Sequence, residues 1–267
     1  MMKLSKNATS IYIVTIVLDW TITQVQIGTT VWRKLKRNDG GRWMYAESGL
    51  IVARIVMNEF YNLICIMNIY LDIETVANLT ALSEDNHILR DKYLKKMEKN
   101  PDWWAALWPE FGKIVCISVS TDSDLFPGDT WVGDDEGLIL HKFAEYVKQF
   151  KDVVRVWHNI KKFDIPYLTR RMVVNGLQLP PALKMRWKKP WEMNVEDTME
   201  MWACNTMDKV SLETICLLLK IPNPKENASG ADIEELHNLG KREEIWAYCA
   251  WDVEATKKVY KTMKFIL

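Results

Sequence analysis

The sequence predicts an α/β fold in which a mixed five-stranded sheet is flanked by helices. Segments with the two-residue apolar alternation typical of strands come in turn with segments that have a helical period. Apart from a helical stripe at 85–99, their order from residue 67 onward is three strands, a helix, a strand, a helix and a strand, followed by helices. This order is typical of α/β domains. The chain has 267 residues, 48% of them hydrophobic, which is enough for a sizeable core.

The first predicted strand shows the alternation most clearly, because Ile69, Leu71 and Ile73 share one face. A Phe-Pro-Gly-Asp turn at 126–129 separates the second and third strands, and Gly176 is a typical C-cap for the helix before it. The predicted strands cover residues 68–74, 113–120, 130–133, 153–158 and 194–198. The predicted helices cover residues 85–99, 136–150, 163–175, 211–220 and 242–264, and a loop covers 222–230.

The 35 basic and 35 acidic side chains cancel to a net charge of zero. This balance, with the high apolar content, excludes intrinsic disorder for most of the chain and argues against a polybasic binder. The zero total is the sum of two segments of opposite charge. Residues 1–66 contain 8 Lys and Arg and 4 Asp and Glu, whereas residues 67–267 contain 27 Lys and Arg and 31 Asp and Glu. Residues 1–66 also lack a sustained apolar period. We interpret them as an N-terminal extension, either unrelated to the domain that follows or translated ahead of the true start.

The five cysteines are scattered and form no Cys-x-x-Cys pair, which is typical of reduced core thiols in a cytoplasmic protein. The best apolar stretch, residues 49–70, contains Arg54 and Glu59 and falls short of the roughly 20 apolar residues that cross a membrane. The apolar run at 11–18 lacks a small-residue cleavage site, so we do not interpret it as a signal peptide. The sequence therefore predicts a cytoplasmic protein without a membrane partner.

Two carboxylates lie in the first predicted strand. Alternation places Asp72 and Glu74 on one face, opposite the aliphatic side chains. Adjacent carboxylates repel each other unless a cation lies between them, so the pair is a natural site for a hard divalent ion. Asp-x-Glu pairs also occur at 134/136, 232/234 and 252/254, which we interpret as loop or helix surface.

A third carboxylate follows the predicted strand 153–158. Asp164 lies near the start of the next helix, with Pro166 compatible with its first turn. The carboxyl end of a strand is the usual location of sites in α/β sheets. Asp164 could instead be an ordinary acidic first-turn residue that the helix dipole favours.

The long C-terminal helix carries a fourth carboxylate. Tyr248 and Asp252 are four residues apart and therefore share a face of the helix, next to a buried stripe that includes Cys249 and Val253. A carboxylate that borders the core is costly unless it is paired or bound to a metal. Trp246, which precedes this pair, is expected to pack inward.

Together these motifs resemble those of the DEDD exonucleases of the ribonuclease H-like superfamily. They are Asp-Ile-Glu-Thr from Asp72, Asn-x-x-x-Phe-Asp ending at Asp164, and Tyr-x-x-x-Asp ending at Asp252. The tyrosine resembles the DEDDy branch, since the other branch has a histidine where this chain has Ala247. The sequences at 111–117 and 163–168, the latter followed by two arginines, are similar to predicted 3′–5′ exonucleases related to the proofreading domain of family B DNA polymerases.

The resemblance covers about residues 67–267 and implies a ribonuclease H-like fold with 3′–5′ exonuclease activity. It also implies two divalent cations, Mg²⁺ or Mn²⁺, which suit oxygen ligands and can activate water and stabilise the leaving 3′-oxygen. By resemblance, Asp72 bridges both ions, Glu74 and Asp252 hold the ion on the nucleophile side, and Asp164 supports the other ion. Tyr248 then orients the attacking water as a protonated phenol.

Substrate contacts are less clearly indicated. Thr75, Asn159 and Phe163 are weaker candidates; Asn159 could instead cap its turn, and Phe163 could instead anchor the core. The segment 183–191 mixes basic residues with two tryptophans, which suits phosphate contact and base stacking. The alternative, a solvated loop whose tryptophans point inward, is somewhat favoured.

The expected partner is nucleic acid, with single-stranded DNA favoured and RNA possible, and no protein partner is indicated. Ribonuclease D-like enzymes share the Tyr-x-x-x-Asp-Val sequence, although they usually carry a further helical domain. The chain could also be a catalytically inactive module that only binds nucleic acid. We expect residues 67–267 alone to fold and to cut nucleic acid.

Overall fold

The protein forms two compact units, Met1–Leu63 and Ile64–Leu267. In the first unit, β1 (Trp20–Ile27), β2 (Thr30–Arg37) and β3 (Met44–Ala46) form an antiparallel sheet in that order. These strands were not predicted from the sequence, because their residues show no regular alternation of polar and apolar types. The computed structural model describes residues 20–27, 30–37, 44–46, 67–78, 87–98, 102–123, 126–150, 153–184, 189, 193–204, 206–222 and 230–266.

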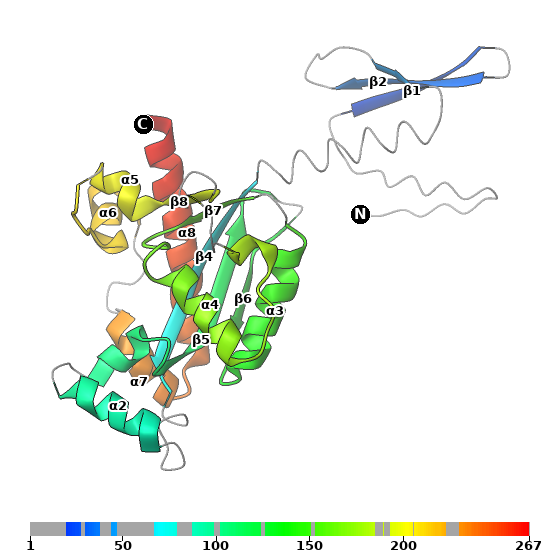
Figure 1. Ribbon diagram of the computed structural model, residues 1–267. Coiled ribbons are helices and arrows are strands. Elements are labelled where there is room, and N and C mark those ends of the chain that lie inside the picture. Colours follow the sequence, from blue (N-terminus) through cyan, green and yellow to red (C-terminus); the bar gives the residue numbers. More distant parts are fainter. Residues whose placement is uncertain are drawn as a thin grey trace. The chain divides into compact units, whose positions relative to one another are not determined.

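The second unit contains the predicted mixed sheet, with strand order β6-β5-β4-β7-β8 (Figure 1). The central strand β4 pairs antiparallel with β5 and parallel with β7. All five predicted strands are present, and β4 continues three residues beyond its predicted end. The strands are β4 (Asn68–Ala77), β5 (Gly112–Thr121), β6 (Asp129–Val132), β7 (Val154–Trp157) and β8 (Val195–Asp197).

The predicted helices are also present, with ends shifted by a few residues. Two short helices, α5 and α7, were not predicted, because six residues are too few to show a helical period. The helices are α2 (His87–Met97), α3 (Glu136–Lys148), α4 (Asp164–Val174), α5 (Thr198–Ala203), α6 (Leu212–Leu218), α7 (Ile233–Asn238) and α8 (Arg242–Ile266). Short 3₁₀ helices include η2 (Asp102–Leu107) and η5 (Gly230–Asp232).

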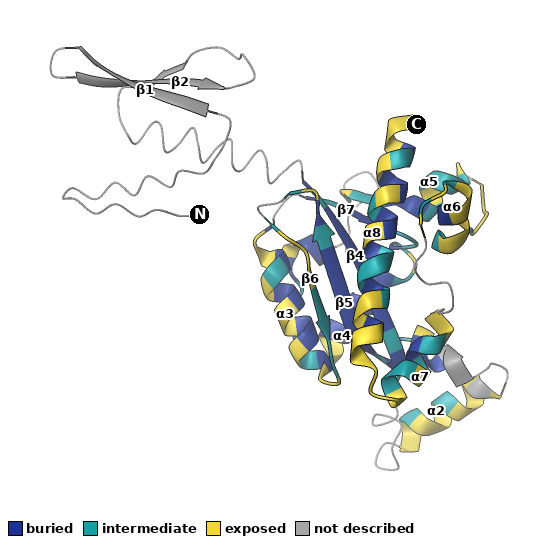
Figure 2. Ribbon diagram, turned by 180° about the vertical axis from the view of Figure 1, so that it is seen from behind, coloured by how far each residue is buried: buried dark blue, intermediate teal, exposed yellow. Residues whose placement is uncertain are grey.

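Helices cover both faces of the sheet, so β4 is buried on both sides. Its aliphatic side chains, led by Leu71, pack into one core with α3 and α4. On the opposite face, Tyr70 packs against Val253 and Tyr260 of α8. Figure 2 shows α8 running along β4 and β5. The polar residues of β4 that face α8 are therefore enclosed between the sheet and this helix.

A β-bulge interrupts the pairing of β4 with β5 next to one of the predicted site residues. Glu74 pairs with Cys116, whereas Thr75 pairs with Ile114, so Val115 is the additional residue. As a result, the neighbouring Val115 and Cys116 both pack into the small core beneath α8. Bulges bend a strand locally and re-aim its side chains.

A close approach between β5 and α4 requires a glycine at position 112. The Tyr167 hydroxyl donates a hydrogen bond of 2.8 Å to the carbonyl oxygen of Ala106. A Cβ atom on Gly112 would overlap that hydroxyl and would lie 2.9 Å from the Ala106 oxygen.

We therefore expect Gly112→Ala to lower the free energy of unfolding by roughly 1–3 kcal/mol, because the buried hydroxyl must move. Urea denaturation followed by circular dichroism measures the change. Gly133→Ala is the matched control, since no atom lies within 4 Å of its added Cβ. Equal stability of the two variants would contradict this account of the packing.

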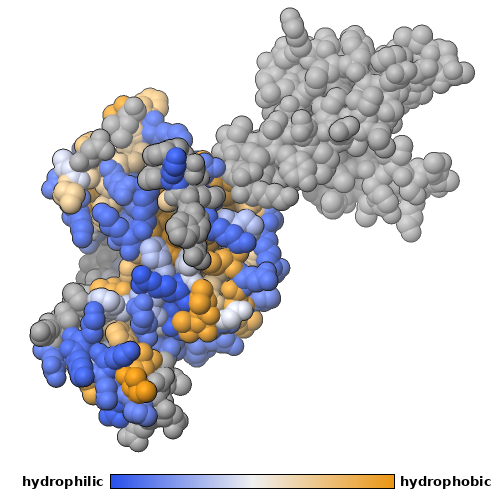
Figure 3. All heavy atoms as spheres, viewed as in Figure 1, coloured by the Kyte–Doolittle hydropathy of each residue, from blue (hydrophilic) through white to orange (hydrophobic). Residues whose placement is uncertain are grey.

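The part of the chain that the structure describes contains no helix long and apolar enough to cross a membrane. On the face shown in Figure 3, most of the described surface is hydrophilic, and the apolar areas form separate patches.

Candidate active site

Asp72 and Glu74 lie on the face of β4 that meets α8. One carboxylate oxygen of each and the Cys249 sulfur of α8 lie within 4.8 Å of one another. Glu74 is buried and Asp72 is half-buried. The alternation predicted for β4 therefore places both carboxylates together, enclosed by a helix from the far end of the sequence.

Cys249, which the helical period predicts only as part of the buried stripe of α8, is a neighbour of both carboxylates. Its thiol donates a hydrogen bond of 3.4 Å to the backbone carbonyl oxygen of Asp72. Burial, together with contact with Cys116, raises the pKa of Cys249 well above its usual range, so the group stays a neutral thiol. Its position three residues before Asp252 was the signal that could have placed it beside the carboxylates.

Asp164 is the first residue of α4 and is only 3% exposed. An ordinary acidic first-turn residue is solvated, so this burial argues against that interpretation. Burial raises the pKa of Asp164 well above its usual range, and the negative charges of Asp72, Asp197 and Asp252 raise it further, although a backbone hydrogen bond lowers it. Asp164 thus lies within electrostatic reach of the carboxylates on β4 and α8.

Tyr248 and Asp252 lie one turn apart on α8. Burial raises the pKa of the Tyr248 phenol, and the charges of Asp252, Glu74 and Asp72 raise it further. The phenol therefore remains protonated and available as a hydrogen-bond donor. A Cβ atom on Gly230 would lie 3.8 Å from the Tyr248 hydroxyl, so η5 passes close beside it.

The three weaker candidates have structural contacts. Asn159 adopts a left-handed conformation with φ of 62°, and its carbonyl oxygen accepts the amide hydrogens of Lys162 and Phe163. Phe163 packs against the core, with its ring centroid 5.4 Å from that of Tyr167. The Thr75 hydroxyl is in hydrogen-bond contact with Tyr167. These contacts support the turn and core interpretations for Asn159 and Phe163.

Among the described residues, the group close enough to share a metal ion is Asp72, Glu74 and Cys249. Asp164 and Asp252 are not part of that group, although the charges of Asp72 and Asp252 act on the Asp164 carboxyl. Burial is the main cause of the raised pKa of Asp164, and the charges of Asp72 and Asp252 add repulsion that a bound divalent cation would relieve. Carboxylate oxygens are the ligands that Mg²⁺ and Mn²⁺ prefer. The residues present therefore fit the divalent cations that such sites use.

Other expected contacts have mixed outcomes. In the segment 183–191, residues 185–188 and 190–191 lie outside the described part of the chain, and Leu183 is buried. The expectation that Trp246 packs inward is wrong, because its side chain is 47% exposed at the surface of α8. The interpretation of 134/136 as surface is wrong for Glu136, which is buried against Arg171.

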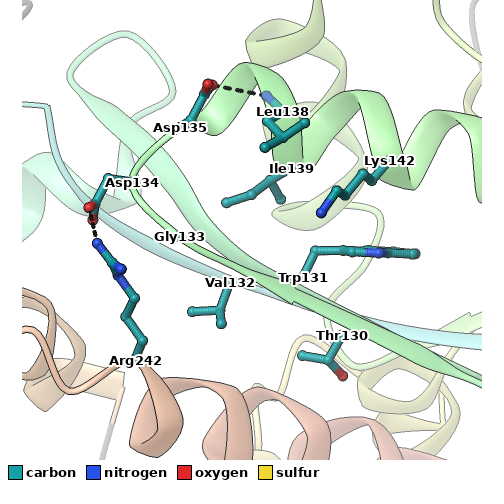
Figure 4. Close-up of a pocket in the computed structure, with 10 residues that line it drawn as sticks. All are labelled: Thr130, Trp131, Val132, Gly133, Asp134, Asp135, Leu138, Ile139, Lys142 and Arg242. Atoms are coloured by element: carbon teal, nitrogen blue, oxygen red, sulfur yellow. Dashed lines mark hydrogen bonds and ion pairs between the residues drawn. The ribbon is translucent and has the colours of Figure 1, made fainter.

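A separate pocket of about 450 Å³ lies along the edge strand β6, between α3 and the start of α8 (Figure 4). Trp131 and Lys142 line it, and Asp134 forms an ion pair with Arg242 at one end. Asp135 accepts a hydrogen bond of 3.0 Å from the amide of Leu138. None of the sequence-predicted site residues lines this pocket, so it is not part of the carboxylate cluster.

The mixed sheet with its flanking helices is the ribonuclease H-like fold of polymerase exonuclease domains. The chain is similar in structure to the family B DNA polymerase from the hyperthermophilic archaeon Pyrobaculum calidifontis, with a TM-score of 0.53 and 17% sequence identity. The match covers 74% of this chain and 24% of the polymerase chain, so this chain spans about a quarter of that protein. At this identity the likeness shows the fold alone.

The chain belongs to the family described as predicted 3′–5′ exonucleases related to the exonuclease domain of PolB, whose model matches residues 110–266. The matched range includes Asp164, Tyr248 and Asp252, and it begins after Asp72 and Glu74. No curated protein matches the sequence. Family membership supports a nuclease of this general kind.

Proposed function

We propose that this protein is a metal-dependent 3′–5′ exonuclease of the DEDDy type that hydrolyses phosphodiester bonds at the 3′ end of single-stranded DNA. The observation that carries the proposal is the pair of carboxylates on β4 beside α8, with a third, buried carboxylate at the start of α4. Asp72 and Glu74 lie side by side, and Asp164 is buried within electrostatic reach of Asp72 and Asp252. The protonated Tyr248 phenol lies in the same electrostatic neighbourhood.

Each residue has a proposed part in the reaction. Asp72 would contact both cations, Glu74 and Asp252 would hold one of them, and Asp164 would support the other. Two bound divalent cations supply an activated water and stabilise the charge on the leaving 3′-oxygen. The Tyr248 hydroxyl would donate a hydrogen bond that orients the attacking water. The buried thiol of Cys249 supports the backbone of Asp72 by donating a hydrogen bond to its carbonyl oxygen.

The test uses single-stranded oligonucleotides of identical sequence, one of DNA and one of RNA, labelled at the 5′ end. We expect the DNA to shorten one nucleotide at a time from its 3′ end in Mg²⁺ or Mn²⁺. Chelation with EDTA should stop the reaction, and added Mg²⁺ should restore it. Faster RNA shortening would instead favour a ribonuclease D-like enzyme, and binding without cleavage would favour an inactive binding module.

We also propose that residues 67–267 contain the whole activity. The carboxylates, Tyr248 and the complete mixed sheet lie within this range. A chain starting at Met67 should therefore fold and degrade DNA at about the rate of the full chain, because every residue proposed for the site is retained. Circular dichroism and the oligonucleotide assay check this expectation. An insoluble or inactive shortened chain would contradict it.

A further inference from the structure

Asp197, the last residue of β8, lies beside the turn that leads to Asp164. It pairs with Trp157 of β7 in the parallel register of the sheet, and it is only 3% exposed. Sequence reasoning placed it in a short strand and gave it no function. Its position at the carboxyl ends of two neighbouring parallel strands is typical of functional residues in α/β sheets.

The Asp197 carboxylate accepts hydrogen bonds from three backbone amides. Its Oδ1 accepts from Asn159 at 2.9 Å and from Met199 at 3.0 Å. Its Oδ2 accepts a longer bond of 3.4 Å from Lys161. The bond to Met199 is the N-cap of α5, whereas the other two reach across to the turn after β7.

That turn combines hydrogen bonds within its own sequence with hydrogen bonds to Asp197. Asn159 is left-handed, with φ of 62°, and Phe163 at the N-cap of α4 makes no side-chain capping bond. The turn closes through the Asn159 carbonyl oxygen, which accepts from Lys162 and Phe163. Asp197 accepts the amide hydrogen of the same Asn159. Asp197 therefore supports the residue whose carbonyl oxygen closes the turn. Asp164 follows directly at the first position of α4.

We propose that Asp197 is a positioning residue that holds Asp164 at the metal-binding carboxylate cluster through its hydrogen bonds to the 159–161 backbone. The proposal rests on the proposed function, since it assigns Asp164 to that cluster. Residues that orient a metal ligand in this way affect metal affinity and activity by about 10–100-fold when they are changed. Asp197 itself is not required to touch the substrate or the cations.

The decisive variant is Asp197→Ser in the full chain. A serine hydroxyl can still cap α5 through Met199, but it is too short to hold Asn159 and Lys161 across the strand end. We expect the Mn²⁺ dissociation constant, measured by calorimetry, to rise by about 10–100-fold and kcat to fall by a similar factor. The KM for the oligonucleotide should stay nearly unchanged. Asp197→Asn keeps an acceptor oxygen for the Asn159 and Met199 amides and loses only the longer bond from Lys161, so it should recover most of both losses.

Asp135→Ser is the matched control, because Asp135 is the N-cap of α3 and accepts the amide of Leu138. It should leave Mn²⁺ affinity and kcat at wild-type values. The proposal is overturned if Asp197→Ser behaves like Asp135→Ser, or if Asp197→Asn is impaired as strongly as Asp197→Ser. If Asp197→Ser does not fold by circular dichroism, Asp197→Asn alone decides the question. Mn²⁺ affinity close to that of the wild type in Asp197→Asn supports the proposal, and loss of Mn²⁺ affinity in a folded Asp197→Asn overturns the proposal. A wild-type chain that binds Mn²⁺ without cleaving DNA contradicts the proposed function, and the Mn²⁺ affinities of the variants still decide the role of Asp197.

Discussion

Asp72→Asn is expected to reduce the exonuclease rate by at least about 100-fold without unfolding the protein. The asparagine has nearly the same shape but lacks the charge that would hold two cations where charge develops in the transition state. Removing this charge also relieves its repulsion of Asp164, whose pKa it now raises. The thermal midpoint should therefore stay equal or rise while activity is lost. The oligonucleotide assay and a thermal melt measure the two effects.

The same loss of activity is expected for Asp252→Asn on α8. Glu254→Gln is the matched control, because Glu254 lies on the same helix and accepts a hydrogen bond from Ser120 instead of facing the cluster. Its rate should equal that of the wild type. A wild-type rate for purified Asp72→Asn would show that the site is assigned wrongly.

Arg171→Met is expected to have the largest effect on stability, lowering the free energy of unfolding by about 3–5 kcal/mol. Both side chains of the Arg171–Glu136 pair are less than 10% exposed, and two nitrogens of Arg171 contact Glu136 at 2.6 and 2.8 Å. Glu136 also accepts the amide of Ile114 at 2.7 Å, and Arg171 donates to the carbonyl oxygen of Pro109 at 2.9 Å. The substitution leaves a buried carboxylate without its countercharge, which is the costly outcome.

Arg170→Met provides the control within the same helix. Arg170 is exposed and lies 3.4 Å from the exposed Glu110, so its loss should cost at most about 1 kcal/mol. Urea denaturation of both variants measures the difference. The double variant Arg171→Met/Glu136→Gln should recover part of the loss, because the buried charge is then absent. Similar stabilities for Arg170→Met and Arg171→Met would contradict the role given to the buried pair.

Much of the fold could be predicted from the sequence because its longer elements carry their aliphatic side chains at regular intervals. The alternation of Ile69, Leu71 and Ile73 in β4 and the apolar stripe of α8 both follow from that geometry. The strands of the first unit and the short helices α5 and α7 were missed. They are too short or too evenly mixed in polarity to show a period, and contacts with other elements decide whether such segments become regular.

Some residues of the candidate site could likewise be predicted from the sequence, and others could not. Asp72, Glu74, Asp164, Tyr248 and Asp252 could be selected from the sequence, because each belongs to a short motif with defined spacing. The contacts of Asp197 with the 159–161 turn, of Cys249 with Asp72 and of Arg171 with Glu136 could not be selected. Each joins residues 35 or more positions apart, and no local pattern specifies which distant groups meet.

The sequence by itself determined the order of the elements, the face on which each carboxylate lies and the chemistry those carboxylates allow. These properties depend on the periods of strand and helix and on side-chain type, which are local. Only the tertiary structure decided that Asp164 is buried, that a bulge lies at Glu74 and that Asp197 supports the turn before α4. Burial, strand register and hydrogen bonds across the sheet depend on how β4, α4, β8 and α8 pack together, and packing is a property of the whole folded domain.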